Sequence, residues 1–429
     1  MKQVTETTYP IEFRKKEAEQ LGHYIQQQKS VVLVGMKRVG ISNFLRFFIN
    51  HPQVPSTYIR TNQPQLFVQV DLNDLIERNL SAFWTLLLTR VVDAAEHSSL
   101  SETDKKACRK LFVQSIQLKD HFFTLDSVRK VIETIIAAGL YPTLFLIRFD
   151  RLSEVFTQDF FSNLLGLRDS VKQQLSYVFT SHRALPDLSP TIFKKQFLSV
   201  FTKDMYLPVA TDGDMKIVAQ TLIEQYHVAP SAKLLDRILE VSGGYVQFVQ
   251  YALIRLHEEA GDASEDAFIE LLPLDEQIVF QSEELFDSLT KHEKDIVIQI
   301  NKGGPISTVE KEHAVYLWNT GIVQGTDGKP TFFSPLFASY VNSLSRNTQL
   351  GRDFTKKEFA LFSYLESHVG QLCEREAIID TVWPESHEMG VSDWAVDRLI
   401  ARLRSKLKSQ SSPYSIETVV TRGYKLIRS

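Results

Sequence analysis

Cysteine and clustered histidine are scarce in this chain, which argues against the chemistry that depends on them. The 429 residues include two cysteines, Cys108 and Cys373, and eleven histidines. Two distant cysteines are too few for a disulfide framework or a cysteine-rich zinc site, so reduced thiols are expected. The histidines do not recur at the spacing of metal ligands. We therefore expect no metal site.

Long hydrophobic runs are also missing. No apolar stretch approaches the ~18 residues of a membrane-spanning helix, and the polar start, Met1 to Glu6, is unlike a signal peptide. We expect a cytoplasmic protein with no membrane partner. With 43% hydrophobic and 23% charged residues, the composition suits a soluble globular protein. The length suits about three domains.

A net positive charge is absent from the chain as a whole, since its formal net charge is −4. Affinity for nucleic acid would therefore have to come from local segregation of charge. Such segregation occurs at the C-terminal end, where residues 391–429 carry eight basic and three acidic side chains. This segment is the strongest candidate for a contact with nucleic acid.

Short apolar runs alternate with amphipathic helical patterns in the first half of the chain. Strand signals lie at residues 31–34, 66–71, 143–147 and 175–180. Because strands that alternate with helices pair in parallel, this order predicts a parallel α/β sheet covered on both faces. We assign this domain to residues 1–210.

Helical patterns alone follow in residues 211–274, with a break at Gly243-Gly244. Residues 275–345 contain short helices and a hairpin signal that ends in the turn residues Asp327-Gly328. The third helical pattern of this segment is not basic, so we interpret it as a structural or interaction winged helix. A polar linker then leads to a last domain, residues 352–429.

The first predicted strand runs into a phosphate-loop pattern. In G-x-x-x-x-G-K-[S/T], backbone N–H groups wrap a phosphate, the lysine neutralises it and the hydroxyl holds Mg²⁺. Gly35, Gly40 and Ser42 stand at their places, but Ile41 occupies the place of the lysine. An isoleucine provides neither charge nor donor, so the chemistry of the loop is incomplete.

The acidic strand departs from its pattern as well. Residues 144–152 read Leu-Phe-Leu-Ile-Arg-Phe-Asp-Arg-Leu. They resemble the form apolar–Asp–Glu–Phe–Asp–Arg–Leu of STAND and archaeal-type AAA+ ATPases. The Asp-Glu pair, which positions Mg²⁺ and polarises water, falls on Ile147 and Arg148. Residues 1–341 thus resemble a P-loop NTPase-like STAND/AAA+ module, with a nucleotide fold, a helical lid and a winged helix.

The missing lysine, aspartate and glutamate limit what this resemblance implies. We expect a module that does not hydrolyse ATP, and hence a chain that is not an enzyme and has no cofactor. ATP binding without hydrolysis stays open, because a helix N-terminus with two glycines attracts phosphate; the alternative is a plain strand-to-helix turn. The candidate nucleotide contacts are Gly35, Lys37, Arg38, Gly40 and Ser42. Ser181-His182-Arg183, at the sensor place of AAA+ proteins, is interpreted as an inert polar strand end.

Residues 352–429 carry the most specific pattern. Thr355-x-x-Glu358 is a capping box, and residues 391–408 form a helical pattern with one apolar and one basic face. Together with Val396-Asp397, Arg402-Leu403-Arg404 and Gly423-Tyr424, the segment closely resembles the OmpR/PhoB-type winged helix of response regulators. The resemblance implies double-stranded DNA as the partner.

The DNA-contacting positions of that family fall on the third helix and the hairpin. Arginine or lysine there can bind guanine edges or phosphates. Trp394 stands where a polar residue is commoner, and Arg422 could replace an arginine that the family has two places earlier. The candidate DNA contacts are Trp394, Arg398, Arg402, Arg404, Lys406, Thr418 and Arg422.

These patterns predict a DNA-binding transcriptional regulator whose N-terminal module serves as a scaffold, dimeriser or effector sensor. One alternative is an ATP-driven STAND switch in signalling or defence. Another is a scaffold whose C-terminal unit recognises protein. Self-association as a homodimer or a larger assembly is a further prediction.

Overall fold

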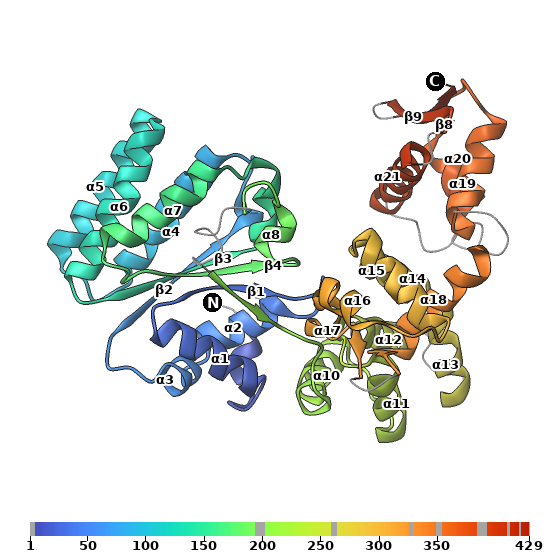
Figure 1. Ribbon diagram of the computed structural model, residues 1–429, viewed down its shortest axis with the longest axis horizontal. Coiled ribbons are helices and arrows are strands. Elements are labelled where there is room, and N and C mark those ends of the chain that lie inside the picture. Colours follow the sequence, from blue (N-terminus) through green and yellow to red (C-terminus); the bar gives the residue numbers. More distant parts are fainter. Residues whose placement is uncertain are drawn as a thin grey trace. The chain divides into compact units, whose positions relative to one another are not determined.

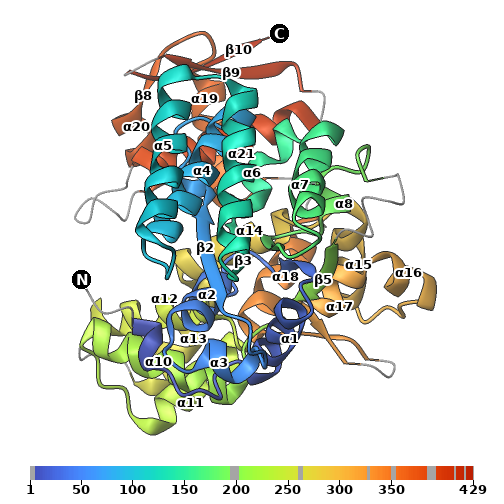
Figure 2. The same cartoon turned by 90° about the vertical axis from the view of Figure 1, so that its left-hand side faces the viewer.

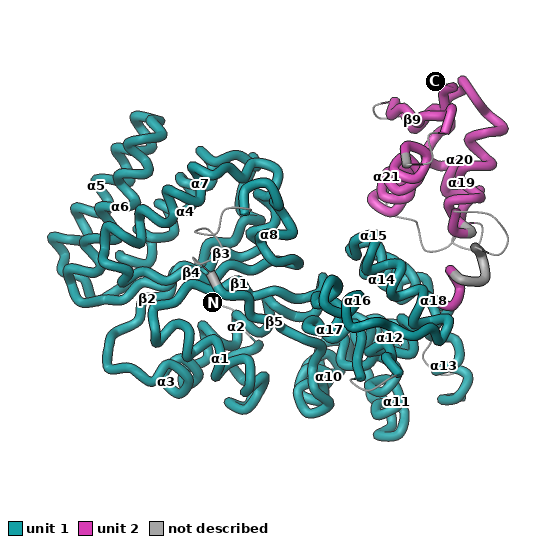
Figure 3. The backbone as a smooth tube through the Cα atoms, viewed as in Figure 1, with its two compact units in different colours: residues 1–341 teal, residues 342–429 magenta. Residues whose placement is uncertain are grey.

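The computed structural model describes residues 5–193, 202–258, 264–325, 329–348, 354–383, 393–409, 412–419 and 422–428. The chain forms two compact units, residues 1–341 and residues 342–429 (Figure 3). Both cysteines are buried free thiols, as the sequence predicts. None of the described helices is long and apolar enough to cross a membrane.

A five-stranded parallel sheet forms the core of the first unit (Figure 1). Its order is β2-β3-β4-β1-β5, with β1 between β4 and β5. All five residues of β1 are buried because helices cover both faces of the sheet. The strands are β1 Ser30–Val34, β2 Gln65–Asp71, β3 Tyr141–Ile147, β4 Ser176–Ser181 and β5 Thr202–Tyr206. The four predicted strands are confirmed, and β5 is an addition.

Helices lie on both faces of this sheet, as predicted (Figure 1). One face carries α1 Lys15–Gln26, α2 Ile41–Asn50 and α3 Val54–Tyr58. The other carries α4 Leu80–Glu96, α5 Glu102–Leu118, α6 His121–Ala137 and α7 Gln158–Ser170. Figure 2 shows α4, α5 and α6 packed side by side. Shorter helical turns are η1 Thr5–Thr8, η2 Leu72–Asp74, η3 Phe149–Val155 and α8 Leu185–Leu188. This parallel sheet with helices on both faces is the α/β arrangement that the sequence predicts, and the phosphate-loop position lies between β1 and α2.

The predicted all-helical region follows β5. It contains α10 Asp212–Tyr226, α11 Ala232–Ser242, α12 Val246–Glu258, α13 Glu265–Leu271, η4 Leu272–Leu274 and α14 Glu276–Asp287. Gly243 and Gly244 end α11 with φ of 58° and 78°. A Cβ on Gly244 would lie 2.2 Å from the carbonyl oxygen of Ala210, so this break must be glycine.

The rest of the first unit consists of short helices and a two-stranded antiparallel ribbon. The elements are α15 Lys291–Asn301, α16 Thr308–His313, α17 Val315–Asn319, β6 Val323–Gln324, β7 Thr331–Phe332 and α18 Pro335–Thr348, whose last residues enter the second unit. The turn predicted at Asp327-Gly328 lies outside the described residues. A winged helix in this segment therefore stays a prediction, as do the finer domain boundaries at 210, 274 and 345.

The second unit packs three helices against a three-stranded antiparallel sheet of order β8-β10-β9. Its elements are α19 Lys356–Ser367, β8 Cys373–Glu374, α20 Arg375–Val382, α21 Asp393–Ser409, β9 Tyr414–Val419 and β10 Gly423–Arg428. The capping box is confirmed: Thr355 N–H donates to Glu358 Oε2 at 2.8 Å, and Glu358 N–H donates to Thr355 Oγ1 at 3.3 Å. Val396, Leu399, Ile400, Leu403 and Leu407 of α21 are in the core, as their spacing predicts.

Candidate functional site

The loop between β1 and α2 is packed with apolar side chains. Met36 and Val39 are almost completely buried. A Cβ on Gly35 would lie 2.9 Å from Val39 Cγ1 and 3.2 Å from Ile41 Cδ1. Ile41, at the place of the phosphate-binding lysine, therefore packs against the loop. Gly40, with φ of 105°, joins the loop to α2.

The segment between α11 and α12, together with α14, covers this loop. Tyr245 is buried and its hydroxyl donates to the carbonyl oxygen of Lys37 at 2.7 Å. Burial raises the pKa of Tyr245 well above its ordinary value, so the phenol stays a donor. Arg38 Nε lies 3.3 Å from Glu284 Oε2 in α14. Of the two predicted phosphate-binding cations, Arg38 is thus paired with a carboxylate of the same unit.

A basic residue, Arg148, follows the carboxyl end of β3, at one of the places where the sequence pattern has an acid. Arg148 has φ of 59°, and its backbone N–H donates to Thr180 Oγ1 at 2.7 Å. Its guanidinium is paired with Asp71 at the end of β2. Asp150, the acid that remains downstream, lies 3.0 Å from Nδ1 of His182. A salt bridge therefore lies at the end of β3, where the sequence pattern of STAND and AAA+ ATPases would place two acids.

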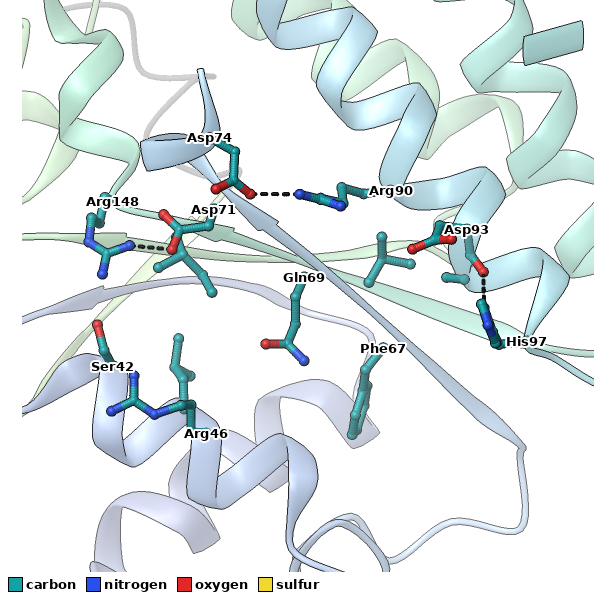
Figure 4. Close-up of a pocket in the computed structure, with 14 residues that line it drawn as sticks. Ser42, Arg46, Phe67, Gln69, Asp71, Asp74, Arg90, Asp93, His97 and Arg148 are labelled. Atoms are coloured by element: carbon teal, nitrogen blue, oxygen red, sulfur yellow. Dashed lines mark hydrogen bonds and ion pairs between the residues drawn. The ribbon is translucent and has the colours of Figure 1, made fainter. Parts of the chain in front are cut away.

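A polar cavity of about 490 Å³ opens beside this salt bridge (Figure 4). Its walls come from α2, β2, α4 and the end of β3, and Ser42 lines it. Three arginines on the walls are paired with carboxylates: besides Arg148 with Asp71, Arg90 lies 2.7 Å from Asp74, and Arg46 lies 2.6 Å from Glu6. In the described part of the chain, no three His, Cys, Asp or Glu side chains come together as a metal site.

Arg183 makes a buried connection that the sequence did not reveal. Its guanidinium donates to both carboxylate oxygens of Glu293, at 2.7 and 2.6 Å, and to the carbonyl oxygen of Ser288 at 2.7 Å. The ring of Tyr316 lies 3.7 Å from the guanidinium carbon. Arg183 therefore ties the end of β4 to α15 and α17, a structural role that the interpretation as an inert polar strand end did not include.

The surface of α21 divides the candidate DNA contacts into two groups. Trp394 is 56% exposed and begins a solvent-facing stripe. The stripe continues with Asp397, Ala401, Ser405 and Lys408, and Arg398 lies beside it, half-buried. Arg402, Arg404 and Lys406 are also only partly exposed.

The second group contacts neighbouring elements of the same unit. Lys406 Nζ lies 2.6 Å from Glu358 Oε2, and Arg402 Nε lies 3.8 Å from Glu358 Oε1; Glu358 itself is fully buried. Arg404 donates to the carbonyl oxygen of Ile416 at 2.8 Å and to Thr418 Oγ1 at 2.7 Å. These cations therefore hold α21 against α19 and β9. Arg422 lies exposed in the turn before β10.

The first group is ordered by contacts within the unit. The guanidinium carbon of Arg398 lies 5.0 Å from the centre of the Trp394 ring, a cation–π arrangement. The next residue, Asp397, accepts a hydrogen bond from the Tyr424 hydroxyl and lies 2.5 Å from Arg375. The Tyr424 hydrogen bond and Arg375 lower the pKa of Asp397. Burial and Asp397 raise the pKa of Tyr424 to about 12.

Three helices, a small antiparallel sheet and an exposed third helix define the second unit as a winged-helix domain. Residues 351–426 match the family model "Transcriptional regulatory protein, C terminal". This segment is accordingly an OmpR-type DNA-binding domain, which confirms the resemblance found in the sequence. It is similar to the transcriptional activator CadC of Escherichia coli K12, with 36% identity over 91 residues. Those residues are 20% of this chain and 17% of CadC, so the likeness covers only the domain.

Solved structures resemble the chain more distantly. The Walker-type ATPase PABY2304 of Pyrococcus abyssi is 14% identical, with a TM-score of 0.49 over 77% of this chain and 95% of that protein. The ORC2 protein of Aeropyrum pernix in its ADPNP–ADP complexes is 13% identical, with a TM-score of 0.44 over 79% and 95%. The fold of the first unit rests on its own strand order and helices rather than on these likenesses.

Proposed function

We propose that this chain is a transcriptional regulator that binds double-stranded DNA through residues 352–429. The observation that carries the proposal is the OmpR-type domain with an exposed third helix. In winged-helix and helix-turn-helix proteins such a helix enters the major groove with its N-terminal residues toward the bases. Trp394 and Arg398 occupy that end of α21, and the exposed side chains of Lys408 and Arg422 are assigned to phosphate contacts in this proposal.

The first unit serves in this proposal as a scaffold or sensor that does not hydrolyse ATP. Three observations support it: the lysine place is an apolar Ile41, the acid places are Ile147 and Arg148, and Tyr245 covers the loop. Hydrolysis needs a cation on the phosphates and acids for Mg²⁺ and water. Without these groups, DNA binding would be controlled by the binding of an effector or by assembly of the protein, and not by ATP hydrolysis.

Binding of the full chain to genomic DNA fragments tests the main proposal. We expect specific sites, with an affinity that falls steeply as salt rises because bound phosphates release counterions. Lys408→Ala should weaken binding to every sequence alike and make the salt dependence shallower. The absence of any bound fragment at low salt, measured by fluorescence anisotropy, would contradict the proposal.

An ATP-binding switch is the second candidate. It is favoured by the start of α2, which has no side-chain cap, and by Ser42 at the edge of the polar cavity. Calorimetry with Mg²⁺–ATP distinguishes the ATP-binding switch from the main proposal, which expects no hydrolysis of ATP. Submicromolar binding together with phosphate release would support the switch instead. Sedimentation of the full chain would measure the predicted self-association.

A further inference from the structure

Strand β2 forms an unprotected edge of the sheet in the first unit. Among the described strands it pairs only with β3. No lysine, arginine or proline occurs in its seven residues, which read Gln-Leu-Phe-Val-Gln-Val-Asp. Proteins commonly protect a sheet edge with such residues, because its unpaired backbone groups can pair with another chain. The opposite edge strand, β5, is shorter and carries the exposed side chains of Lys203 and Asp204. The edge at β2 therefore remains open to a further strand.

The backbone of β2 offers hydrogen-bonding groups along this edge. Tyr141, at the start of β3, donates its N–H to the carbonyl oxygen of Pro64 at 2.8 Å. Because backbone groups alternate in direction along a strand, the even-numbered residues of β2 face β3 and the odd-numbered residues turn their N–H and C=O groups outward. Phe67 and Gln69 are outward residues in the middle of β2. In the described part of the chain, no hydrogen bond occupies their outward backbone groups.

Two helices turn this edge into a groove. The polar cavity of about 490 Å³ lies along β2, with α2 on one side and α4 on the other (Figure 4). Phe67 and Gln69 point to the α2 side: the ring centres of Phe67 and Phe48 are 6.5 Å apart, and Gln69 Nε2 lies 3.5 Å from Asn50 Oδ1. A second copy of β2 would bring its own α2 and α4 against these walls. A single extended segment, which carries no flanking helices, suits the groove better.

Asp93 indicates the charge that a ligand of this groove should carry. The three arginines on the walls, Arg46, Arg90 and Arg148, are already paired with carboxylates. Asp93 lies exposed on the α4 wall, and its carboxylate has no ion pair with any described residue. A lysine or arginine of the ligand would supply the missing partner. On the α2 wall, the half-buried ring of Phe67 suits an apolar side chain.

We propose that this groove binds an extended peptide segment of a partner protein, which adds to the sheet as a strand beside β2. Main-chain hydrogen bonds to Phe67 and Gln69 hold the peptide, and its alternate side chains face α2 and α4. The side chain that faces α4 is a lysine or arginine beside Asp93, and the one that faces α2 is apolar. This inference goes beyond the proposed function and does not rest on it, since no residue of the DNA-binding domain takes part.

Selection of peptides on the full-length chain tests the proposal. Linear peptides of about ten residues, long enough to span β2, are selected from a random displayed library, and the enriched peptides are synthesised. We expect them to carry a lysine or arginine at a position that alternates with apolar residues. Hydrogen exchange at the amides of Phe67 and Gln69 should slow when a peptide binds, because these N–H groups become hydrogen-bonded.

A scan of N-methylated peptides distinguishes strand addition from other modes of binding. Methylation of one backbone nitrogen at a time removes a single donor from the peptide. Affinity should fall about tenfold at every second residue and change little at the residues between, because only alternate N–H groups face β2. The protein is the same throughout the scan, so a loss of folding cannot produce this alternation.

Variants of Asp93 test the charge of the ligand. Asp93→Asn should weaken the binding of a selected peptide about fivefold, the value of one exposed ion pair. Asp93→Lys should weaken it further, and exchanging the basic residue of the peptide for glutamate should restore binding to this variant alone. Glu102→Lys is the matched control, since it reverses an exposed charge on α5, outside the groove. It should leave the affinity unchanged.

The opposite results would overturn the proposal. They are a selection that enriches no peptide, peptides that bind the wild type and Asp93→Lys equally, or a methylation scan without alternation. Gln69→Pro removes one outward N–H from β2. If this substitution dissociates a self-associated full-length chain in sedimentation, a second copy occupies the edge, and the peptide assignment is wrong. Because none of these measurements involves DNA, a failure of the proposed function would leave their results unaffected.

Discussion

The two units of this protein depart in different places from the sequence patterns that they resemble. In the first unit the departures are internal: Ile41 packs into the phosphate-loop position and Arg148 closes a salt bridge with Asp71. In the second unit the departures are on the surface, at Trp394 and Arg422. In our proposal, the first kind removes a reaction and keeps the fold. The second kind, in the same proposal, keeps both the fold and the binding surface and changes only what that surface can recognise.

This contrast has a physical reason. A fold depends on many core residues, each of which contributes a small part of the stability. Phosphate-transfer chemistry depends on a few groups at fixed places. Replacing those few groups by residues that pack or pair well removes the chemistry at little cost in stability. We therefore expect the strongest internal contacts of the first unit to be structural.

The largest expected effect is at the buried ion pair of the first unit. Arg183→Met should destabilise this unit by about 3–5 kcal/mol, because Glu293 would be left as a buried, unpaired charge. Lys216→Met is the matched control, since its pair with Asp236 is exposed and should contribute less than about 1 kcal/mol. Hydrogen exchange, read separately for the two units, measures both. Equal effects of the two substitutions would contradict the structural role of Arg183.

In the second unit, the buried charged residue to test is Glu358. Glu358→Ala should destabilise that unit by about 2–3 kcal/mol, because it removes a charged hydrogen-bond partner of Lys406 and one half of the capping box. Glu358→Gln keeps the capping geometry and loses only the charge, so it should cost less. Urea unfolding, monitored by hydrogen exchange, measures the stability of each unit. A fall in stability of the first unit alone would refute this assignment.

A smaller effect on stability is expected at Tyr245, which lies between α11 and α12 and covers the loop between β1 and α2. Tyr245→Phe removes the hydrogen bond to the carbonyl oxygen of Lys37 and should cost about 1 kcal/mol. The ring still fills its place, so the fold should be unchanged. Thermal unfolding of the full chain measures the cost. A gain of ATP binding in this variant would show that the tyrosine, rather than the lost lysine, blocks the site.

The smallest effect concerns pH and the pair of Asp397 and Tyr424. The pKa of Asp397 is lowered in the folded state. Its carboxylate therefore stabilises the fold at pH values above the ordinary pKa of 3.8, and this stabilisation is lost as the pH falls through the folded pKa. The pKa of Tyr424 is raised to about 12, so its contribution is present below pH 10 and is lost between pH 10 and about 12. Both are modest because Asp397 is half exposed.

Tyr424→Phe tests this pair directly. It should raise the pKa of Asp397 toward 3.8, since the first cause of the lowered value is the tyrosine hydrogen bond. The carboxyl chemical shift of Asp397, followed by NMR as a function of pH, measures it. Arg375→Met should raise the same pKa as well, because the Arg375 guanidinium donates to Asp397 and carries a positive charge. An Asp397 titration that does not change in Tyr424→Phe would exclude the hydrogen bond as the cause.

Local patterns predicted much of this fold. The four apolar strands, the helices between them, the capping box at Thr355 and the core face of α21 follow from periodicity and capping. The strand β5 was missed because Thr-Lys-Asp-Met-Tyr has no apolar run; its pairing with β1 makes it a strand. Most of the candidate DNA contacts lie on α21, but the residues that they contact in the folded unit could not be predicted from spacing along that helix.

The sequence alone determined the order of the elements, the presence of Ile41, Ile147 and Arg148 at three places of the phosphate-loop and acidic-strand patterns, and the OmpR-type pattern of the last domain. These are local properties, since each depends on residue types at short spacing. The tertiary structure alone decided that Lys406 turns to Glu358, that Tyr245 covers the phosphate loop and that Arg183 pairs with Glu293. Each of these contacts joins residues far apart in the chain, and only the packing of whole elements brings them together.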